Sequence, residues 1–391
     1  MRKEVYIYSG NHGKLGGVED YFSIIRGILE QNDVDLIVSD KLIPNKTNIL
    51  IDEFTNYIEN KKLEKFKEEY PNSKLIFVLT EFVERKWLVE SFNHFGGVFN
   101  SSLVALLNCY IPLKRKDFDN PSVSDMLLAL LYLPVFLIYA PFLIGMGGAK
   151  RIKTKLKNKR AVKNSDLSLI GKHYSLIYLC LRYWGLRSFM VHASEVVYAH
   201  SGVKESFHKS KGLHPPKELG VLHPVISEER VLEDLFIDKE RFFEITGSVT
   251  AYRASWMSKI DLVIRIYGMH NLFEKCKQFS FSSLNKKTVK RGAFSLHPPQ
   301  TKKWPYSSPT RIYRALAIDN NLPVLTHYFN QHPIEKLCSV YSGVDTLVEL
   351  NDMFEDRQVA VRKLSERIKE YNRIAQAENQ LLVMSCSEKI L

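Results

Sequence analysis

The sequence has little cysteine and no apolar leader. Its cysteines number five in 391 residues, an odd total, and none of their spacings matches a metal-binding motif. These features exclude a small disulfide-bonded scaffold and favour free thiols in a reducing compartment. The first eleven residues contain no long apolar run, so we expect no secretory signal. Long disorder is also excluded, because 45% of the residues are hydrophobic and 25% are charged.

Acidic residues are outnumbered by basic ones. The chain has 55 Lys and Arg against 43 Asp and Glu, a formal net charge of +12. This excess favours an anionic partner: nucleic acid, anionic lipid or a phosphorylated small molecule.

Residues 126–146 form a run of 21 residues without a charge, which is long enough to span a bilayer core of about 30 Å. The segment 149–163 follows with eight Lys and Arg and no acid. A single span would divide the strands on either side of it between two compartments, so we expect a segment that dips in at Pro134 and Pro141 or lies in the interface. Its basic tail would then contact anionic headgroups. The alternatives are a buried core helix and a solvated loop. Nucleic acid is the weaker choice of partner, because no nucleic-acid-binding motif accompanies the basic run.

Strand and helix signals alternate through the rest of the first half. Short apolar runs predict strands, and a run with helical spacing predicts a helix from about Tyr21. The predicted strands are Val5–Ser9, Leu36–Val38, Asn48–Asp52, Lys74–Leu79, Glu195–His200 and Leu219–His223, with helices at Asn56–Tyr70 and Tyr174–Met190. This order is typical of a parallel sheet covered on both faces.

The second half repeats the alternation after an acidic, polar crossing at about 227–239. Its predicted strands are Phe242–Thr246, Gln278–Ser282, Ala293–Leu296 and Leu322–Thr326, and its predicted helices are Ser255–Tyr267, Pro309–Ile318 and Arg357–Leu382. We therefore predict an α/β protein of two facing Rossmann-like domains, with the ligand cleft at the carboxyl ends of the strands. The predicted bounds are 1–226, with a membrane-associated insertion at 110–170, then 227–356, then a C-terminal helix at 357–391.

Two segments have the composition of anion sites. Gly16 and Gly17 precede a helix directly after the first strand, where backbone N–H groups can approach an anion, although a simple turn explains them equally well. The second segment has a strand that runs into His297-Pro298, followed by Ser307, Ser308 and Thr310 at a helix start. Hydroxyls and amides at a helix N-terminus suit a phosphate, and His297 can donate to a phosphate oxygen. His-Pro pairs also begin at 214, 223 and 332, where loop punctuation is the simpler interpretation.

The residues around these segments resemble a known family. The loop Gly16-Gly17-Val18-Glu19 resembles that of retaining GT-B glycosyltransferases, and 308–326 resembles their donor-binding helix and strand. The His-Pro pair followed by the Ser/Ser/Thr cluster is similar to enzymes that use CMP-activated sugars. Together these features most resemble the retaining β-Kdo transferases of bacterial surface polysaccharide assembly. Two features differ: Arg314 stands where the family usually has an acid, and the acid-acid-glycine motif of inverting sialyltransferases is absent.

The resemblance implies a membrane-associated transferase on the cytoplasmic face of the inner membrane, acting in lipopolysaccharide or capsule synthesis. It would transfer Kdo from CMP-Kdo, with retention and without a metal or other cofactor, to a lipid-linked glycan acceptor. His297, Pro298, Ser307, Ser308 and Thr310 would hold the nucleotide phosphate, together with Gly16, Gly17 and Arg253. A UDP- or GDP-sugar donor and a non-catalytic membrane scaffold are the alternatives.

A retaining transferase can use a carboxylate nucleophile. Glu53 and Glu81 follow predicted strands whose carboxyl ends would face the cleft, and they are the first candidates; Glu19, Asp234 and Asp238 are others. Each of these, like Arg253, has a surface role as its simpler interpretation.

Overall fold

A computed structural model describes most of the two predicted α/β regions. The described residues are 3–9, 18–51, 57–80, 189–209, 216–246, 264–267, 279–282, 291–299, 307–328 and 332–388, with Pro134 and Leu186. The predicted membrane segment, except for Pro134, lies outside them.

The first half folds into a six-stranded sheet with the order β2-β1-β3-β4-β5-β6, in which every neighbouring pair is parallel. Its strands are β1 (Lys3–Tyr8), β2 (Val34–Ser39), β3 (Thr47–Ile51), β4 (Lys74–Leu79), β5 (Glu195–Tyr198) and β6 (Glu218–Val221). The interior strands β3 and β5 are buried along their whole length, as expected for strands covered on both faces. The described helices of this half are α1 (Val18–Glu30), α2 (Tyr57–Glu69) and α7 (Ser201–His208).

The second half forms another six-stranded parallel sheet, with the order β12-β11-β10-β7-β8-β9. Its strands are β7 (Lys239–Thr246), β8 (Ile264–Tyr267), β9 (Phe279–Ser282), β10 (Arg291–His297), β11 (Leu322–Leu325) and β12 (Ser339–Val340). Helix α8 (Glu228–Asp234) lies in the crossing between the two sheets, and α10 (Pro309–Ala317), the 3₁₀ helix η2 (Pro333–Leu337) and α11 (Val344–Glu355) follow.

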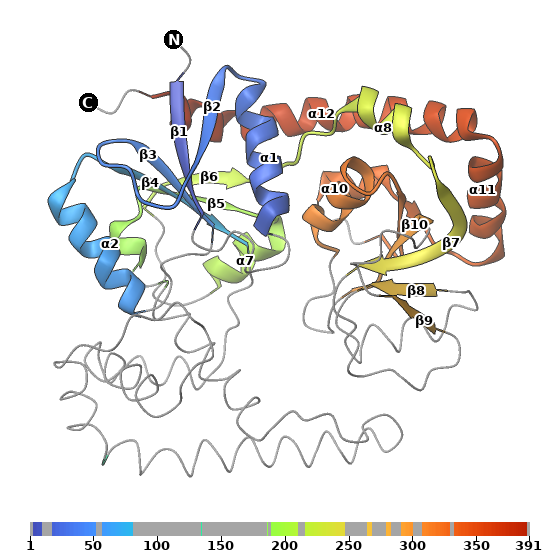
Figure 1. Cartoon of the computed structure of the whole chain (residues 1–391), viewed down its shortest axis with the longest axis horizontal. Helices are drawn as coiled ribbons and strands as arrows, with labels where there is room; N and C mark the ends of the chain where they lie inside the picture. Colours follow the sequence, from blue (N-terminus) through green and yellow to red (C-terminus); the bar gives the residue numbers. More distant parts are fainter. Residues whose placement is uncertain are drawn as a thin grey trace.

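The last helix, α12 (Arg357–Ser387), extends over both halves (Figure 1). Its 31 residues span about 46 Å at 1.5 Å per residue. Side chains spaced three or four residues apart are buried along one face of this helix, as the helical period requires. Leu364, Ile368 and Tyr371 join the core of the second half, whereas Leu382 and Cys386 join a core of the first half.

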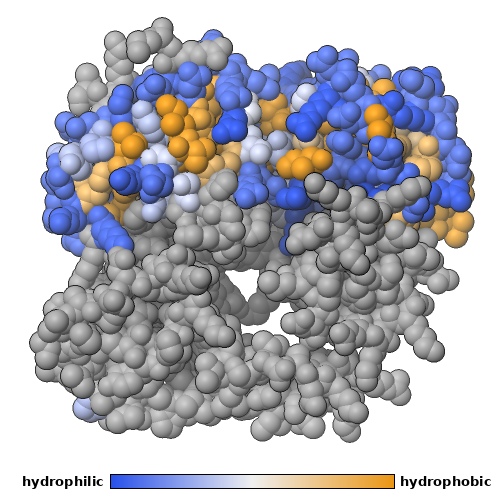
Figure 2. All heavy atoms as spheres, in the orientation of Figure 1, coloured by the Kyte–Doolittle hydropathy of each residue, from blue (hydrophilic) through white to orange (hydrophobic). Residues whose placement is uncertain are grey.

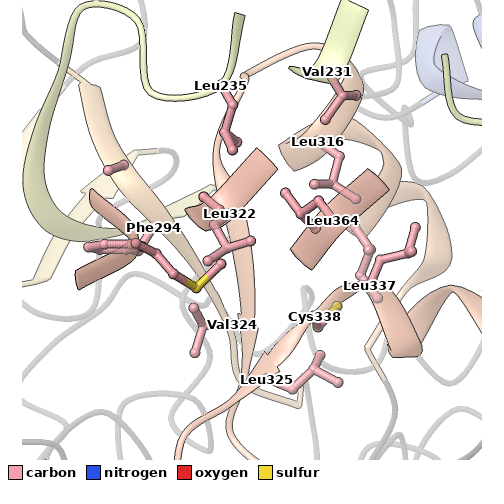
Figure 3. Close-up of a cluster of buried hydrophobic side chains, with 14 of the residues drawn as sticks. Val231, Leu235, Phe294, Leu316, Leu322, Val324, Leu325, Leu337, Cys338 and Leu364 are labelled. Carbon is pink, nitrogen blue, oxygen red and sulfur yellow. The ribbon is translucent and has the colours of Figure 1, made fainter. Parts of the chain in front are cut away.

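The core of the second half collects apolar side chains from every layer. Figure 3 shows Leu364 of α12, Leu316 of α10 and Leu322 of β11 within one cluster. The first half has two clusters, one with α1 and the end of α12, the other with Phe77, Phe189 and Phe207. Burial of the apolar side chains of the second-half cluster fixes α10 against β10 and β11. This packing determines the position of the first turn of α10.

Most predicted elements within the described residues are confirmed to within one to three residues. The predicted helix Tyr174–Met190 lies largely outside them. The predicted helix Ser255–Tyr267 is wrong at its end, because Ile264–Tyr267 forms strand β8 between β7 and β9. The run Ile-Arg-Ile-Tyr alternates with the period of a strand, and parallel pairing on both sides favours that conformation. The sequence pattern predicts no counterpart of helices α7, α8 and α11, of the 3₁₀ helix η2 or of strand β12. Helix α12 contributes side chains to both cores, and the domain bounds 1–226, 227–356 and 357–391 stay predictions.

Among the described residues, no helix combines the length and the apolar character required to cross a bilayer. On the face drawn in Figure 2, apolar side chains of the described part lie scattered among hydrophilic ones. Scattered exposed apolar residues are usual on folded proteins and indicate no binding surface by themselves.

Candidate active site

A buried histidine ends strand β10. His297 is 6% exposed, and its Nε2 atom has no hydrogen-bond partner among the described residues. Burial lowers the pKa of His297 to about 4, so the imidazole is neutral at pH 7. The following residue, Pro298, is buried as well. A buried polar atom without a partner is unusual, and His297 therefore has a hydrogen-bonding position to offer a ligand.

The start of helix α10 lies at the same edge of the sheet as His297, because β10 and β11 are parallel and α10 connects the end of one to the start of the other. Ser307 and Thr310 are buried, and Ser308 occupies the N-cap position. The Ser308 hydroxyl makes no cap bond to the helix and lies 2.6 Å from the Thr310 hydroxyl. This edge therefore holds two paired hydroxyls at the positive end of a helix, which suits an anion.

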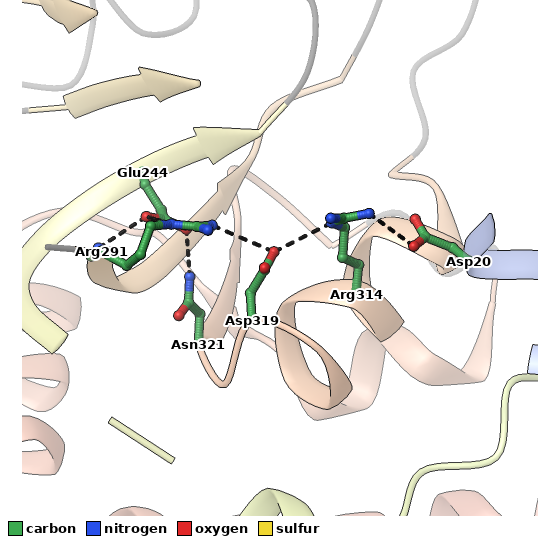
Figure 4. Close-up of polar contacts among 7 residues, drawn as sticks. Asp20, Glu244, Arg291, Arg314, Asp319 and Asn321 are labelled. Atoms are coloured by element: carbon green, nitrogen blue, oxygen red, sulfur yellow. Dashed lines mark hydrogen bonds and ion pairs between the residues drawn. The ribbon is translucent and has the colours of Figure 1, made fainter. Parts of the chain in front are cut away.

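Helix α1 of the first half faces α10 through an ion pair. Arg314 Nη1 lies 2.9 Å from Asp20 Oδ1, and Arg314 Nε lies 3.5 Å from Asp319 Oδ2. Asp20 is almost completely buried; burial raises its pKa, and the positive charge of Arg314 offsets only part of that rise. The pair joins the first turn of α1 to the middle of α10 (Figure 4).

The ion pair continues into the second sheet. Arg291 bridges Asp319 and Glu244, and the Glu244 carboxylate also accepts from the Gly292 N–H at 2.9 Å and from Asn321 Nδ2 at 2.6 Å (Figure 4). A Cβ atom at Gly292 would lie 2.6 Å from the Phe242 carbonyl oxygen, so only glycine fits this irregularity of β10. The fully buried Glu244 is thus compensated, as a buried carboxylate must be.

Two further histidines meet where the chain crosses between the sheets. The rings of His223, which follows β6, and His332, which precedes η2, stack with their centroids 4.4 Å apart. His332 Nδ1 accepts from the Ile334 N–H at 3.2 Å, so its Nε2 carries the proton and donates to the Leu222 carbonyl at 3.3 Å. These contacts hold the carboxyl end of β6 against the second half.

The carboxyl edge of the first sheet therefore faces the second half. His200 lies beyond the end of β5 and is buried, with Nδ1 accepting from the Gly202 N–H at 3.1 Å. Burial lowers the pKa of His200 and of His223 to about 4, and that of His332 well below its usual value. Strands β3 and β4 end at this same edge, since the sheet is parallel throughout.

The structure brings His297, Pro298, Ser307, Ser308 and Thr310 to one edge of the second sheet, as the sequence pattern predicts. Their role in binding stays a prediction. Five other predicted site residues lie outside the described residues: Gly16, Gly17, Glu53, Glu81 and Arg253. The further carboxylate candidates are described, with Glu19 and Asp238 exposed and Asp234 partly buried.

Sequence reasoning passed over several residues of this region. His223 and His332 each precede a proline, and that repeated pair was the available signal. Asp20 and Arg311 carried no signal, because nothing local in the sequence tells which charges meet across the fold. No cluster of three or more His, Cys, Asp or Glu suited to a metal occurs within the described ranges.

No protein-family model and no curated protein sequence matches the chain. Among solved structures, the chain is similar to an α-glucosyltransferase in complex with UDP and a 13-mer DNA containing an HMU base. The TM-score is 0.46 and the identity 9%, and the alignment covers 98% of this chain and 99% of that one. A likeness at this level assigns no activity.

The strand order and this edge define a class: a two-sheet parallel α/β protein, with polar groups gathered between two facing halves. In parallel α/β proteins, ligands bind beyond the carboxyl ends of the strands. The edge that holds His297 and the start of α10 is therefore the candidate active site.

The buried neutral histidines make stability depend on pH. In the unfolded chain a histidine takes up a proton near pH 6.5, whereas His200, His223 and His297 resist protonation until about pH 4 when folded. The unfolded state thus binds more protons between these values, and stability falls as the pH falls through that window. Each histidine accounts for about 2 kcal/mol of this loss between pH 7 and 4.5.

We expect His297→Asn to reduce the fall in unfolding free energy over that range by about 2 kcal/mol. Urea unfolding of both proteins at several pH values measures it. Parallel curves for the wild type and the variant would show that His297 is not buried in its neutral form.

Proposed function

We propose that the chain is a glycosyltransferase of GT-B type that transfers Kdo from CMP-Kdo, with retention, to a lipid-linked or polysaccharide acceptor. The fold supports this proposal through its two parallel sheets joined by a helix that packs on both. The resemblance of the His297–Thr310 segment to CMP-sugar enzymes supports the choice of donor. Without that segment, the fold alone would leave the activity open.

The observation that carries the proposal is the unpartnered Nε2 of His297 beside the start of α10. In the tautomer protonated on Nε2, the neutral imidazole donates a hydrogen bond to a phosphate oxygen. The hydroxyls of Ser308 and Thr310 and the positive end of α10 would stabilise the same phosphate. All of these interactions strengthen as negative charge develops on the leaving group, which is the requirement for catalysis of transfer.

In the proposed reaction, the bond between the anomeric carbon and the phosphate oxygen breaks, and CMP leaves with the bonding electrons. A carboxylate oxygen forms a bond to that carbon. The acceptor hydroxyl then attacks the carbon, loses its proton to a base and releases the carboxylate. Two inversions at the same carbon give net retention.

Glu53 and Glu81 are proposed for the carboxylate because they follow β3 and β4 in the sequence. Those strands end at the edge of the first sheet that faces the second half, where His200 and His223 also lie. The nucleophile would attack from the face of the sugar opposite the nucleotide, so an origin in the other half of the molecule fits this requirement.

The proposal also includes attachment to an anionic membrane through the apolar run 126–146 and the basic run 149–163. A lipid-linked acceptor would reach the site from that surface. The expected location is the cytoplasmic face of the inner membrane.

Calorimetry with CMP, UDP and GDP tests the donor class. We expect CMP to bind and His297→Asn to weaken its affinity about tenfold to 100-fold, because a hydrogen bond to a charged phosphate is lost. His208→Asn is the matched control, since His208 pairs with Glu218 on the exposed side of the first half. Binding of UDP or GDP without CMP would contradict the CMP donor and favour the other sugar nucleotides. If no nucleotide binds, a scaffold role replaces the enzymatic one.

The nucleophile is tested by the amide variants Glu53→Gln and Glu81→Gln. One of them should lose turnover while CMP affinity changes less than about threefold, because the nucleotide is held by the other half. Intact mass spectrometry on a reaction stopped early should find one sugar attached to the nucleophilic residue. Full activity in both variants would remove these two residues from the chemistry.

Membrane attachment is tested by deleting residues 126–146, which should move the protein from the membrane fraction to the supernatant. Neutralising the basic run should weaken attachment, whereas salt alone should not release the intact protein, because salt screens charge and leaves apolar insertion unaffected. Complete release of the intact protein by high salt would rule out insertion.

A further inference from the structure

Helix α10 carries two arginines three residues apart, on the same side of the helix. They differ in whether a carboxylate lies beside them. Arg314 is paired with Asp20 and Asp319. Arg311 lies one turn closer to the helix start. Among the residues that the structure describes, no carboxylate forms an ion pair with Arg311, and no acceptor forms a hydrogen bond with its guanidinium.

Arg311 is nevertheless partly buried. Burial lowers the pKa of its guanidinium, and the phenol of Tyr21 on α1 interacts with its charge. An arginine retains its proton in such a site, and a tyrosine phenol is neutral at pH 7, so no described residue compensates the positive charge. Buried charges are normally paired, because an uncompensated one is strongly unfavourable.

The position of Arg311 makes the unpaired charge still less favourable. It is the third residue of α10, within the first turn, where the helix dipole is positive and a cation is repelled. The first turn contains no acid to balance it. A charge that opposes both burial and the helix dipole indicates that its counter-ion is a ligand rather than part of the chain.

The same edge has independent features of an anion site. His297, nine-tenths buried or more, has its Nε2 unpartnered, and the Ser308 and Thr310 hydroxyls form a pair at the helix start. The planar guanidinium of an arginine matches the oxygens of a phosphate with two parallel hydrogen bonds.

We propose that Arg311 supplies the counter-charge for a phosphate group bound between the first turns of α10 and α1, and that it neutralises the leaving phosphate of the donor. This inference rests on the proposed function, of which it names a further binding residue. It also separates the two arginines by role: Arg314 fixes α10 to α1, and Arg311 binds the ligand.

The proposal predicts opposite effects of two matched variants on the melting temperature in phosphate-free buffer. Arg311→Met removes an uncompensated charge, so we expect the melting temperature to rise. Arg314→Met leaves the buried Asp20 without its partner, so we expect the melting temperature to fall. A fall in Arg311→Met equal to that in Arg314→Met would show that Arg311 is structural, and would overturn the proposal.

The ligand arm uses inorganic phosphate as the probe, with sodium chloride at matched ionic strength. Saturating phosphate should raise the melting temperature of the wild type by about 2 to 4 °C. The rise should vanish in Arg311→Met, return at least in part in Arg311→Lys, and persist in Arg241→Met, a control at an exposed arginine of β7. No rise in the wild type, or an undiminished rise in Arg311→Met, would contradict the proposal.

Separate results contradict the anion site and the nucleotide proposal. If phosphate stabilises the protein through Arg311 but CMP does not bind, the proposed function is wrong and the anion site stands. If CMP binds the wild type and Arg311→Met with equal affinity, the role of Arg311 is wrong and the nucleotide proposal stands. If Arg311→Met does not fold, Arg311→Lys is compared with Arg241→Met in phosphate. Loss of the phosphate-induced rise in melting temperature in Arg311→Lys alone would contradict a site based on the charge of residue 311.

Discussion

The arrangement of the two halves depends on how helix α12 holds the segment that joins them. Asn379 accepts from the His223 N–H at 3.0 Å and donates to the His223 carbonyl at 2.7 Å, and Asn372 makes the same pair of bonds with Ile226. Tyr371 donates to the Pro224 carbonyl at 2.7 Å. The backbone N–H and C=O groups of the crossing segment are therefore hydrogen-bonded by side chains of α12. This helix is itself buried in both cores. Backbone groups buried in this way would be strongly unfavourable without those partners.

Fixing the crossing determines which surfaces face each other. The carboxyl ends of β5 and β6 and the first turn of α1 meet η2 and α10, and the contacts between them are a histidine stack and an ion pair. The histidines are buried and neutral, so they hydrogen-bond and stack without requiring a counter-charge. Among the described residues of this region, Arg314 is compensated by Asp20 and Asp319, whereas Arg311 forms no ion pair. Within the described part of the chain, the candidate site thus combines a frame of ion pairs, hydrogen bonds and a histidine stack with the unpartnered Nε2 of His297 and with Arg311, although the buried Nδ1 of His223 also lacks a partner.

The parts of the fold that could be predicted are those in which local pattern and tertiary packing agree. Strands β3 and β4 are continuous apolar runs, and such runs in alternation with helices identify a parallel sheet. The period of α12 identifies its buried face, but Leu364 and Leu382 do not differ in a way that would assign them to different cores. Strand β8 is four residues long and comes directly after residues with helical spacing. Its pairing with β7 therefore could not be predicted from the local sequence.

For the site, the same division holds. His297 and the start of α10 could be predicted, because a strand, a turn and a helix start are all local features. The pairing of Arg314 with Asp20, 294 residues apart in the sequence, could not, and the unpaired state of Arg311 follows only once that pairing is known. The sequence pattern therefore identified the hydroxyls and the imidazole but not the cation beside them.

The central claim is that a nucleotide phosphate binds at the start of α10 between the two halves. A crystal structure of the protein with CMP tests it most directly. The account predicts phosphate oxygens within hydrogen-bonding distance of His297 Nε2 and the Arg311 guanidinium, with Arg314 still paired to Asp20. A phosphate bound elsewhere, with His297 and Arg311 free of contact to it, would contradict the account.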